Sequence, residues 1–286
     1  MKNFITSVFC AVMICFFLAG ATLSAQEEES KLDNFEKKVS KEEKDADKEK
    51  KSDENSDSSD ETAEIAASIA SNPGALKTTG IVIYGLFITV PGEDSLLYLG
   101  DYSNCYYAQY PYVSREEGLF SDVLGKRLSI TISGHYFYDE SNLTGIGVRA
   151  RFSPHPYFNA ELHFTDLTEE LSNRDEHLKL YNVFVNYNRM RLQRWAFWWG
   201  LGLKGLQGDK TYNGFAFNLG TEIYPAKPVS LNFSYSGGFI NDTYVPEFYG
   251  AVNLHLNRFA IFAGYQYWSA GSAKIDGILG GVKLFF

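Results

Sequence analysis

The chain has 286 residues, a net charge of −9 and an aromatic content of 16%. This length allows one or two domains. The negative balance lacks the basic footprint of a nucleic-acid-binding protein, and three cysteines are too few for a disulfide scaffold.

The first 25 residues have the pattern of a secretory signal. Lys2 precedes an apolar run over residues 4–18, and small residues follow. Cleavage is expected after Ala25, with Ala21 as the alternative site. Export would remove two of the three cysteines, so the mature chain would keep only Cys105 and could form no internal disulfide.

Residues 26–75 form a charged segment of low complexity. Between Gln26 and Glu64 there are sixteen acidic residues and eight lysines, so most of the net charge lies here. Such a composition cannot bury enough apolar area to offset the entropy lost on ordering. We therefore expect a disordered tail, which after export would lie in the periplasm.

Residues 76–126 have a less regular pattern. The stretch 81–90 is apolar but too short to cross a bilayer as a helix, and the aromatic stretch 106–112 contains Pro111, which disfavours a central strand. Two interpretations stay open for this segment. It forms either irregular structure associated with the following domain or a pair of additional strands.

From residue 127 to residue 286, apolar residues alternate with small or polar ones, and turn-forming residues recur between the alternating stretches. Helical periodicity is absent between these stretches, which favours an antiparallel meander. The pattern predicts an all-β fold, a transmembrane, antiparallel, up-and-down β-barrel of about ten strands, with eight or twelve as alternatives. The strands are expected at 127–139, 142–153, 157–167, 177–189, 194–206, 211–224, 228–239, 246–256, 258–269 and 273–286.

One face of each predicted strand is large and apolar, whereas the other is small or polar. In the last strand, Val282 and Leu284 share one face, and Gly281 and Lys283 share the other. In a soluble protein the polar face would lie outside and would carry more charge than it does here. We therefore expect the apolar face to contact lipid and the polar face to line the lumen.

The end of the chain resembles the assembly signal of bacterial outer-membrane β-barrel proteins. That signal ends in an aromatic residue, with an apolar residue two positions earlier and a glycine further back, and Phe286, Leu284 and Gly281 occupy these places. The resemblance covers residues 127–286 and reaches the class, not a specific characterised family. It implies residence among outer-membrane lipids and insertion by the barrel-assembly machinery.

Several titratable residues are predicted to point into the lumen. Buried charges require partners, so these residues are expected to form a polar network that fills the interior. Arg149 and Glu161, on neighbouring strands, are expected to pair. The predicted network comprises His135, Arg149, Arg151, Glu161, His163, Lys204, Glu222, His255 and Lys283.

Neither a nucleophile–base pair nor a cluster of metal ligands can be assembled from the sequence. We therefore expect a non-enzymatic outer-membrane protein with a structural or surface-interaction role, without a cofactor, metal or nucleic acid, and with a periplasmic or surface partner of unspecified kind. A small-solute channel is the first alternative, because Gly, Ser and Asn are frequent on the predicted inner face. A hydrolase, either a protease or a lipid deacylase, is the second, based on Asp175, His177 and Ser269 near the predicted outer rim.

Overall fold

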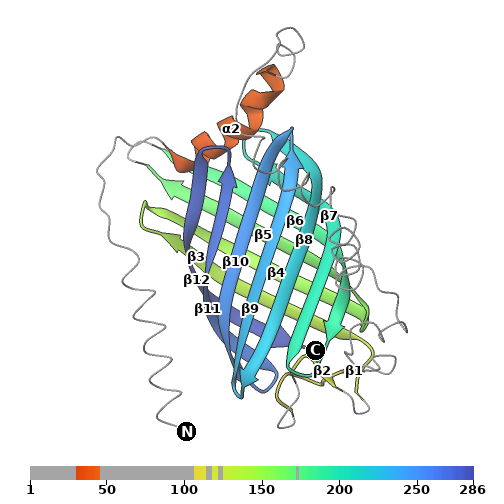
Figure 1. Ribbon diagram of the computed structural model, residues 1–286. Coiled ribbons are helices and arrows are strands. Elements are labelled where there is room, and N and C mark those ends of the chain that lie inside the picture. The colour runs from red at the N-terminus through yellow and green to blue at the C-terminus, as the bar shows by residue number, and fades with distance from the viewer. Residues whose placement is uncertain (1–29, 46–105, 114–117, 122–124, 172–173) are drawn as a thin grey trace, which may run out of the picture.

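The computed structural model describes residues 30–45, 106–113, 118–121, 125–171 and 174–286. Ten antiparallel strands form a closed barrel in chain order, and the last strand pairs with the first (Figure 1). The predicted fold and strand number are confirmed. The strands are β3 (Ser129–Asp139), β4 (Leu143–His155), β5 (Phe158–Glu170), β6 (Asp175–Arg191), β7 (Trp195–Gln207), β8 (Thr211–Ala226), β9 (Val229–Ile240), β10 (Thr243–Leu256), β11 (Phe259–Ala270) and β12 (Ala273–Phe285).

The connections between the strands are short at both ends of the barrel. Residues 240–245, which the predicted strands 228–239 and 246–256 leave as a connection, instead form the end of β9, a two-residue turn and the start of β10. Asn241 and Asp242 in this turn have φ angles of 50° and 63°. Positive φ at both central positions matches the right-handed twist of a hairpin, and Asn and Asp tolerate it. The length of the connections therefore does not distinguish one end of the barrel from the other.

The two faces of the strands are divided as the alternation predicts. On β12, Ile278, Val282 and Leu284 are exposed on the outside, whereas Leu279 and Lys283 are buried in the lumen. The final residue, Phe286, exchanges backbone hydrogen bonds with Ile130 of β3 (N···O distances of 2.9 and 3.2 Å). The chain therefore ends inside the closing strand pair.

One helix, α2 (Lys31–Asp45), covers one end of the barrel (Figure 1). Its apolar residues Leu32, Phe35 and Val39 are spaced i, i+3, i+7 and are fully buried, and the Ser30 hydroxyl caps its first turn by accepting the Asp33 N–H. The prediction of a tail without regular structure does not hold for these residues. It was based on the average composition of the segment, which three apolar residues hardly change. Among the described residues, no helix is both long and apolar enough to cross a bilayer.

The opposite end carries a separate two-stranded sheet, β1 (Tyr106–Tyr107) with β2 (Phe120–Ser121). Neither strand joins the barrel. The remainder of residues 76–126, Cys105, most of the charged tail and the predicted signal lie outside the described residues.

Residues of this segment close the lumen at that end. Tyr107 donates a hydrogen bond from its hydroxyl to the His155 carbonyl oxygen (3.1 Å), and Tyr112 donates to the Val229 carbonyl oxygen (2.5 Å). Burial raises the pKa of the Tyr112 phenol above its ordinary value, because the phenolate would lose its hydration. A cluster of buried apolar and aromatic side chains fills this end: Tyr107, Tyr112, Leu119, Phe120, Ala196, Trp198 and Tyr224.

We call the two ends the α2 rim and the β1–β2 rim. Both ends of the barrel segment, at Ser129 and Phe286, lie at the β1–β2 rim, opposite α2. The sequence prediction placed the tail in the periplasm. Because α2 lies at the rim opposite the barrel ends, that placement of α2 requires the barrel ends to face the other side of the membrane.

Candidate functional site

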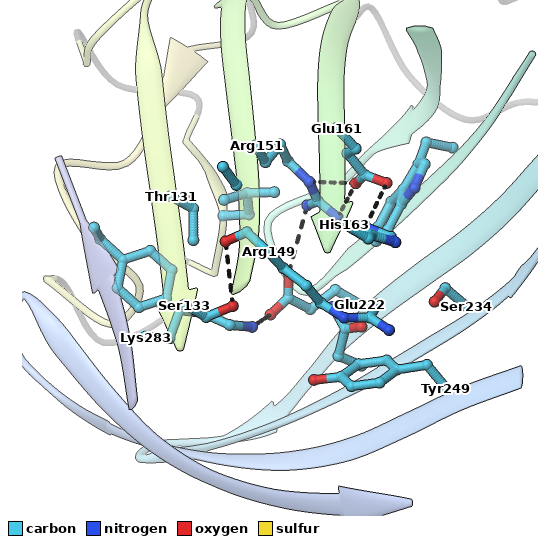
Figure 2. Close-up of a pocket in the computed structure, with 15 residues that line it drawn as sticks. Thr131, Ser133, Arg149, Arg151, Glu161, His163, Glu222, Ser234, Tyr249 and Lys283 are labelled. Atoms are coloured by element: carbon cyan, nitrogen blue, oxygen red, sulfur yellow. Dashed lines mark hydrogen bonds and ion pairs between the residues drawn. The ribbon is translucent and has the colours of Figure 1, made fainter. Parts of the chain in front are cut away.

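The lumen contains three layers. Apolar residues lie beneath α2, aromatic and amide side chains lie at the β1–β2 rim, and a layer of charged residues separates them. We call the middle part the charged layer. It contains the carboxylates Glu161, Glu222 and Glu247 and the cations Arg149, Arg151, Lys204 and Lys283, with His163 beside them. Figure 2 shows the part of this layer around Arg149, Arg151 and Glu222.

Glu247 on β10 is the most highly coordinated carboxylate of this layer. It pairs with Lys204 (3.1 Å) and with Arg149 (3.3 Å), two cations from different strands. Its oxygens also accept hydrogen bonds from Asn182 (2.7 Å), Gln266 (2.9 Å) and the Ser236 hydroxyl (3.3 Å). A carboxylate that is only 4% exposed requires such compensation, and here five groups supply it.

Glu161 on β5 has a different partner from the one expected. It pairs with Arg151, with the two side chains 2.6 Å apart, and not with Arg149. Arg151 and Glu161 stand directly opposite each other in the β4–β5 ladder, whereas Arg149 stands opposite His163. The carboxylate also accepts a hydrogen bond from Asn218 (3.0 Å) and lies 3.6 Å from His163 Nε2.

Glu222 on β8 completes the layer from the far side of the lumen. It lies 3.8 Å from Lys283 Nζ and 3.9 Å from Arg151, and it accepts a hydrogen bond from Ser230 (3.4 Å). The two ion-pair distances are longer than any of those around the other two carboxylates. Arg151 thus links Glu161 to Glu222 across the interior.

Both arginines of β4 also contact aromatic rings. Arg149 lies 3.8 Å from the centre of the Tyr249 ring, and Arg151 lies 4.0 Å from that of Trp198. A guanidinium is weakly hydrated and planar, so it can pair with a carboxylate at its edge and stack on a ring with its face. These contacts fix both arginines in the middle of the lumen.

Two of the predicted histidines lie apart from the ion pairs. His255 packs against Tyr112 and Phe285 and shares a hydrogen bond with Ser230 (2.8 Å). His135 is buried, and neither of its ring nitrogens has a hydrogen-bond partner among the described residues. It packs edge-on against Phe262 instead. His135 therefore lies in the lumen as predicted but makes no hydrogen bond in the network.

A small cavity of about 50 Å³ lies within the charged layer. Arg149, Arg151 and Lys283 line it together with Glu161 and Glu222. Its volume admits a few water molecules at most. Three cationic side chains and two carboxylates line it, so the cavity is bounded by one more positive than negative charge when His163 is neutral.

Glu247 was absent from the predicted network. It lies within the predicted strand 246–256 but was not counted among the inward residues. In the structure Pro246 lies within β10, where it stands opposite Gly237. Alternation back from His255 through Asn253, Ala251 and Tyr249 places Glu247 on the inner face of that strand.

The residues considered for a hydrolase are not brought together. Ser269 lies on β11 and His177 on β6, and four strands, β12, β3, β4 and β5, separate these two in the barrel. His177 contacts Thr168 on the neighbouring strand (3.1 Å). Within the described parts of the chain, no group of three His, Cys, Asp or Glu residues is placed to hold a metal ion.

Comparison with known proteins gives matches of structure only. Solved barrels that match include an anion-selective porin from Comamonas acidovorans (10% identity, 53% of this chain, TM-score 0.29) and the N-terminal β-barrel domain of Pseudomonas aeruginosa OprF (9% identity, 55% of this chain, TM-score 0.27). The matches cover 58% of the porin chain and 97% of the OprF domain. No family model matches the sequence, and no curated protein matches it either.

Proposed function

We propose that the protein is a bacterial outer-membrane β-barrel with a structural or surface-interaction role and a lumen filled by its own polar network. The apolar exterior carries this proposal. Ile146 and Val185 are 67% and 64% exposed, and every strand of the barrel carries similarly exposed large apolar residues. A contiguous apolar band of this kind is not maintained in water, whereas a closed barrel in lipid satisfies all its backbone hydrogen bonds.

The ends of the exterior band support the same conclusion. Exposed aromatic side chains include Tyr138, Phe239 and Tyr244 near the α2 rim. Phe158, Trp195 and Phe259 are exposed near the β1–β2 rim. Aromatic residues at both edges of an apolar band are typical of barrels whose rims lie at the two membrane interfaces.

A substitution at the end of the closing strand tests whether the barrel-assembly machinery is a partner. Phe286→Ser should reduce the amount of folded barrel in the outer membrane, because the terminal aromatic belongs to the sequence that resembles the assembly signal. Phe239→Ser is a matched control, since Phe239 is equally exposed outside (55% against 54%) but lies far from the C-terminus. Membrane fractionation with heat-modified gel mobility measures both variants. Equal yields for Phe286→Ser and wild type would show that assembly does not depend on the terminal aromatic residue.

The filled lumen supports a non-conducting role. The charged layer contains a cavity of about 50 Å³, α2 covers one rim, and Tyr107 and Tyr112 close the other. Planar-bilayer recordings of the purified protein should show no large, steady conductance. Such a conductance would favour the small-solute channel instead, and the excess positive charge of the charged layer predicts preference for anions in that case.

We place the barrel ends in the periplasm, which puts the α2 rim at the cell surface. In a Cys105→Ser background, a membrane-impermeant maleimide should label Lys37→Cys on α2 in intact cells. It should label Arg258→Cys, in the β10–β11 turn, only after permeabilisation. Labelling of Arg258→Cys alone in intact cells would reverse the orientation, and protection of both sites would show that α2 is not held at the cell surface.

A further inference from the structure

The α2 rim has the features of a helix-binding surface. The lumen beneath it is lined with apolar residues such as Leu167, Trp268 and Ile275, each no more than 2% exposed. Phe35 and Val39 of α2 belong to the same buried cluster. Recognition of an amphipathic helix by apolar anchors at i, i+3 and i+7 requires a surface of this kind.

Polar contacts fix the N-terminus of the bound helix. The Glu169 carboxylate accepts the backbone N–H groups of Lys31 (3.0 Å) and Leu32 (2.9 Å) and the hydroxyl of Ser30 (2.8 Å). The first N–H groups of a helix have no partner within the helix and carry partial positive charge. Glu169 therefore recognises the end of the helix and not merely its apolar side.

Further contacts fix its direction across the rim. The Lys31 ammonium pairs with Asp139 (2.5 Å), and Glu36 accepts the backbone N–H groups of Asp209 and Lys210 in the β7–β8 turn (3.1 Å each). Towards the other end, Asn241 donates a hydrogen bond to the Val39 carbonyl oxygen (2.8 Å). The contacts thus come from three different strand connections around the rim.

The barrel does not need α2 for closure. All ten strand pairs are complete without it, and sixty residues, 46–105, separate it from β1. A helix that docks on the rim through one face, and is joined to the barrel by a separate segment of the chain, competes with free helices at a finite effective concentration. We propose that the α2 rim is a binding site for amphipathic helices of this chemistry, which α2 occupies in cis and from which a partner's helix can displace it.

The test uses the full-length chain in detergent and a fluorescent peptide of residues 30–45, followed by anisotropy. Phe35→Ala in the protein weakens the resident helix and leaves the rim intact, so the wild-type peptide should bind this variant at least tenfold more tightly than it binds wild-type protein. Phe35→Ala in the peptide should weaken binding to the same variant at least tenfold. Phe35→Ala thus strengthens peptide binding when it is made in the protein and weakens it when it is made in the peptide.

Two further variants keep the outcome unambiguous. Lys37→Ala, on the exposed side of α2, should leave peptide binding unchanged whether it is made in the protein or in the peptide. Combining Glu169→Ala with Phe35→Ala in the protein should abolish the gain, because the rim loses its contact with the helix N-terminus. Circular dichroism and heat-modified gel mobility confirm that each variant is folded.

Either of two results would overturn the proposal. One is that the Phe35→Ala protein binds the wild-type peptide no better than wild-type protein does. The other is that it binds the Phe35→Ala peptide as tightly as the wild-type one, which would indicate nonspecific apolar contact. The assay takes place in micelles and does not depend on the cellular membrane, orientation or conductance, so it can fail while the proposed function holds.

Discussion

The apolar layer beneath α2 and the charged layer below it are neighbouring parts of one lumen, and they are filled by different means. The charged layer is filled by long side chains of the strands themselves, which pair across the interior. The apolar layer is completed by Phe35 and its neighbours from a helix remote in sequence. A ten-stranded barrel is wider than the eight-stranded barrels that side chains alone just fill. Ion pairs between long side chains and a docked helix are two ways to occupy the additional space.

The two layers should respond differently when a side chain is removed. Loss of an apolar contact leaves a gap, whereas loss of a buried carboxylate leaves charges without a partner. Loss of a surface ion pair, whose charges are already solvated by water, should have a smaller effect than either.

The largest effect is expected for Glu247→Ala. This change leaves Arg149 and Lys204 buried without their shared carboxylate, and we expect the free energy of unfolding to fall by about 3–5 kcal/mol. Urea titration of the protein in lipid vesicles measures it. Glu247→Gln is the comparison variant, since it keeps the shape of the side chain and one acceptor oxygen while it removes the charge and the second acceptor. A loss below about 1 kcal/mol for the alanine variant would mean that water solvates this layer.

The next effect concerns packing between neighbouring strands. A Cβ atom on Gly281 would lie 2.1 Å from the Gly134 carbonyl oxygen and 2.8 Å from His135 Cα, both backbone atoms. Gly281→Ala should therefore destabilise the barrel by about 1–3 kcal/mol through overpacking. Its neighbour Gly280 faces outwards, where the nearest atom would be 3.8 Å away, so Gly280→Ala should be nearly neutral in the same titration. Equal effects at both positions would contradict the inward orientation of Gly281.

A double-mutant cycle tests which arginine Glu161 binds. Substitution of Arg151 and Glu161 by Met, singly and together, should give a coupling energy of about 0.5–3 kcal/mol, because the two side chains are in direct contact. The parallel cycle with Arg149 and Glu161 should give a smaller value, since Arg149 contacts Glu247 instead. The opposite ranking of the two couplings would restore the pairing expected from the sequence.

That pairing shows where sequence reasoning stops. The alternation of residues has a period of two, so it determined the strands and identified the inward residues of β4 and β5. It did not determine the register between these strands. A bulge between Phe152 and His155 shifts the register in this hairpin and brings Arg151 opposite Glu161. Bulges leave little trace in a single sequence, so the facing partner was beyond prediction.

Helix α2 was missed for a different reason. The segment was judged by its composition, and three apolar residues do little to the average of a strongly charged stretch. Their spacing, however, places Leu32, Phe35 and Val39 on one side of a helix. The helix is stabilised by docking on the rim, so its formation depends on contacts with distant residues such as Glu169 and Asn241.

The smallest effect is expected for the ion pair on the exposed side of α2. Lys37 and Asp33 form a salt bridge at i, i+4 spacing, and the lysine side chain is 54% exposed. Exposed pairs of this kind contribute about 0.3–0.5 kcal/mol, because water and salt screen the charges and holding two long side chains costs entropy. Lys37→Ala should therefore lower the free energy of unfolding by no more than about 0.5 kcal/mol, and less at high salt. Urea titrations at two salt concentrations measure this change. A loss comparable to that of Glu247→Ala would show that the exposure of an ion pair does not predict its contribution to stability in this protein. The expected difference between the exposed pair of α2 and the buried pairs of the lumen would then be absent.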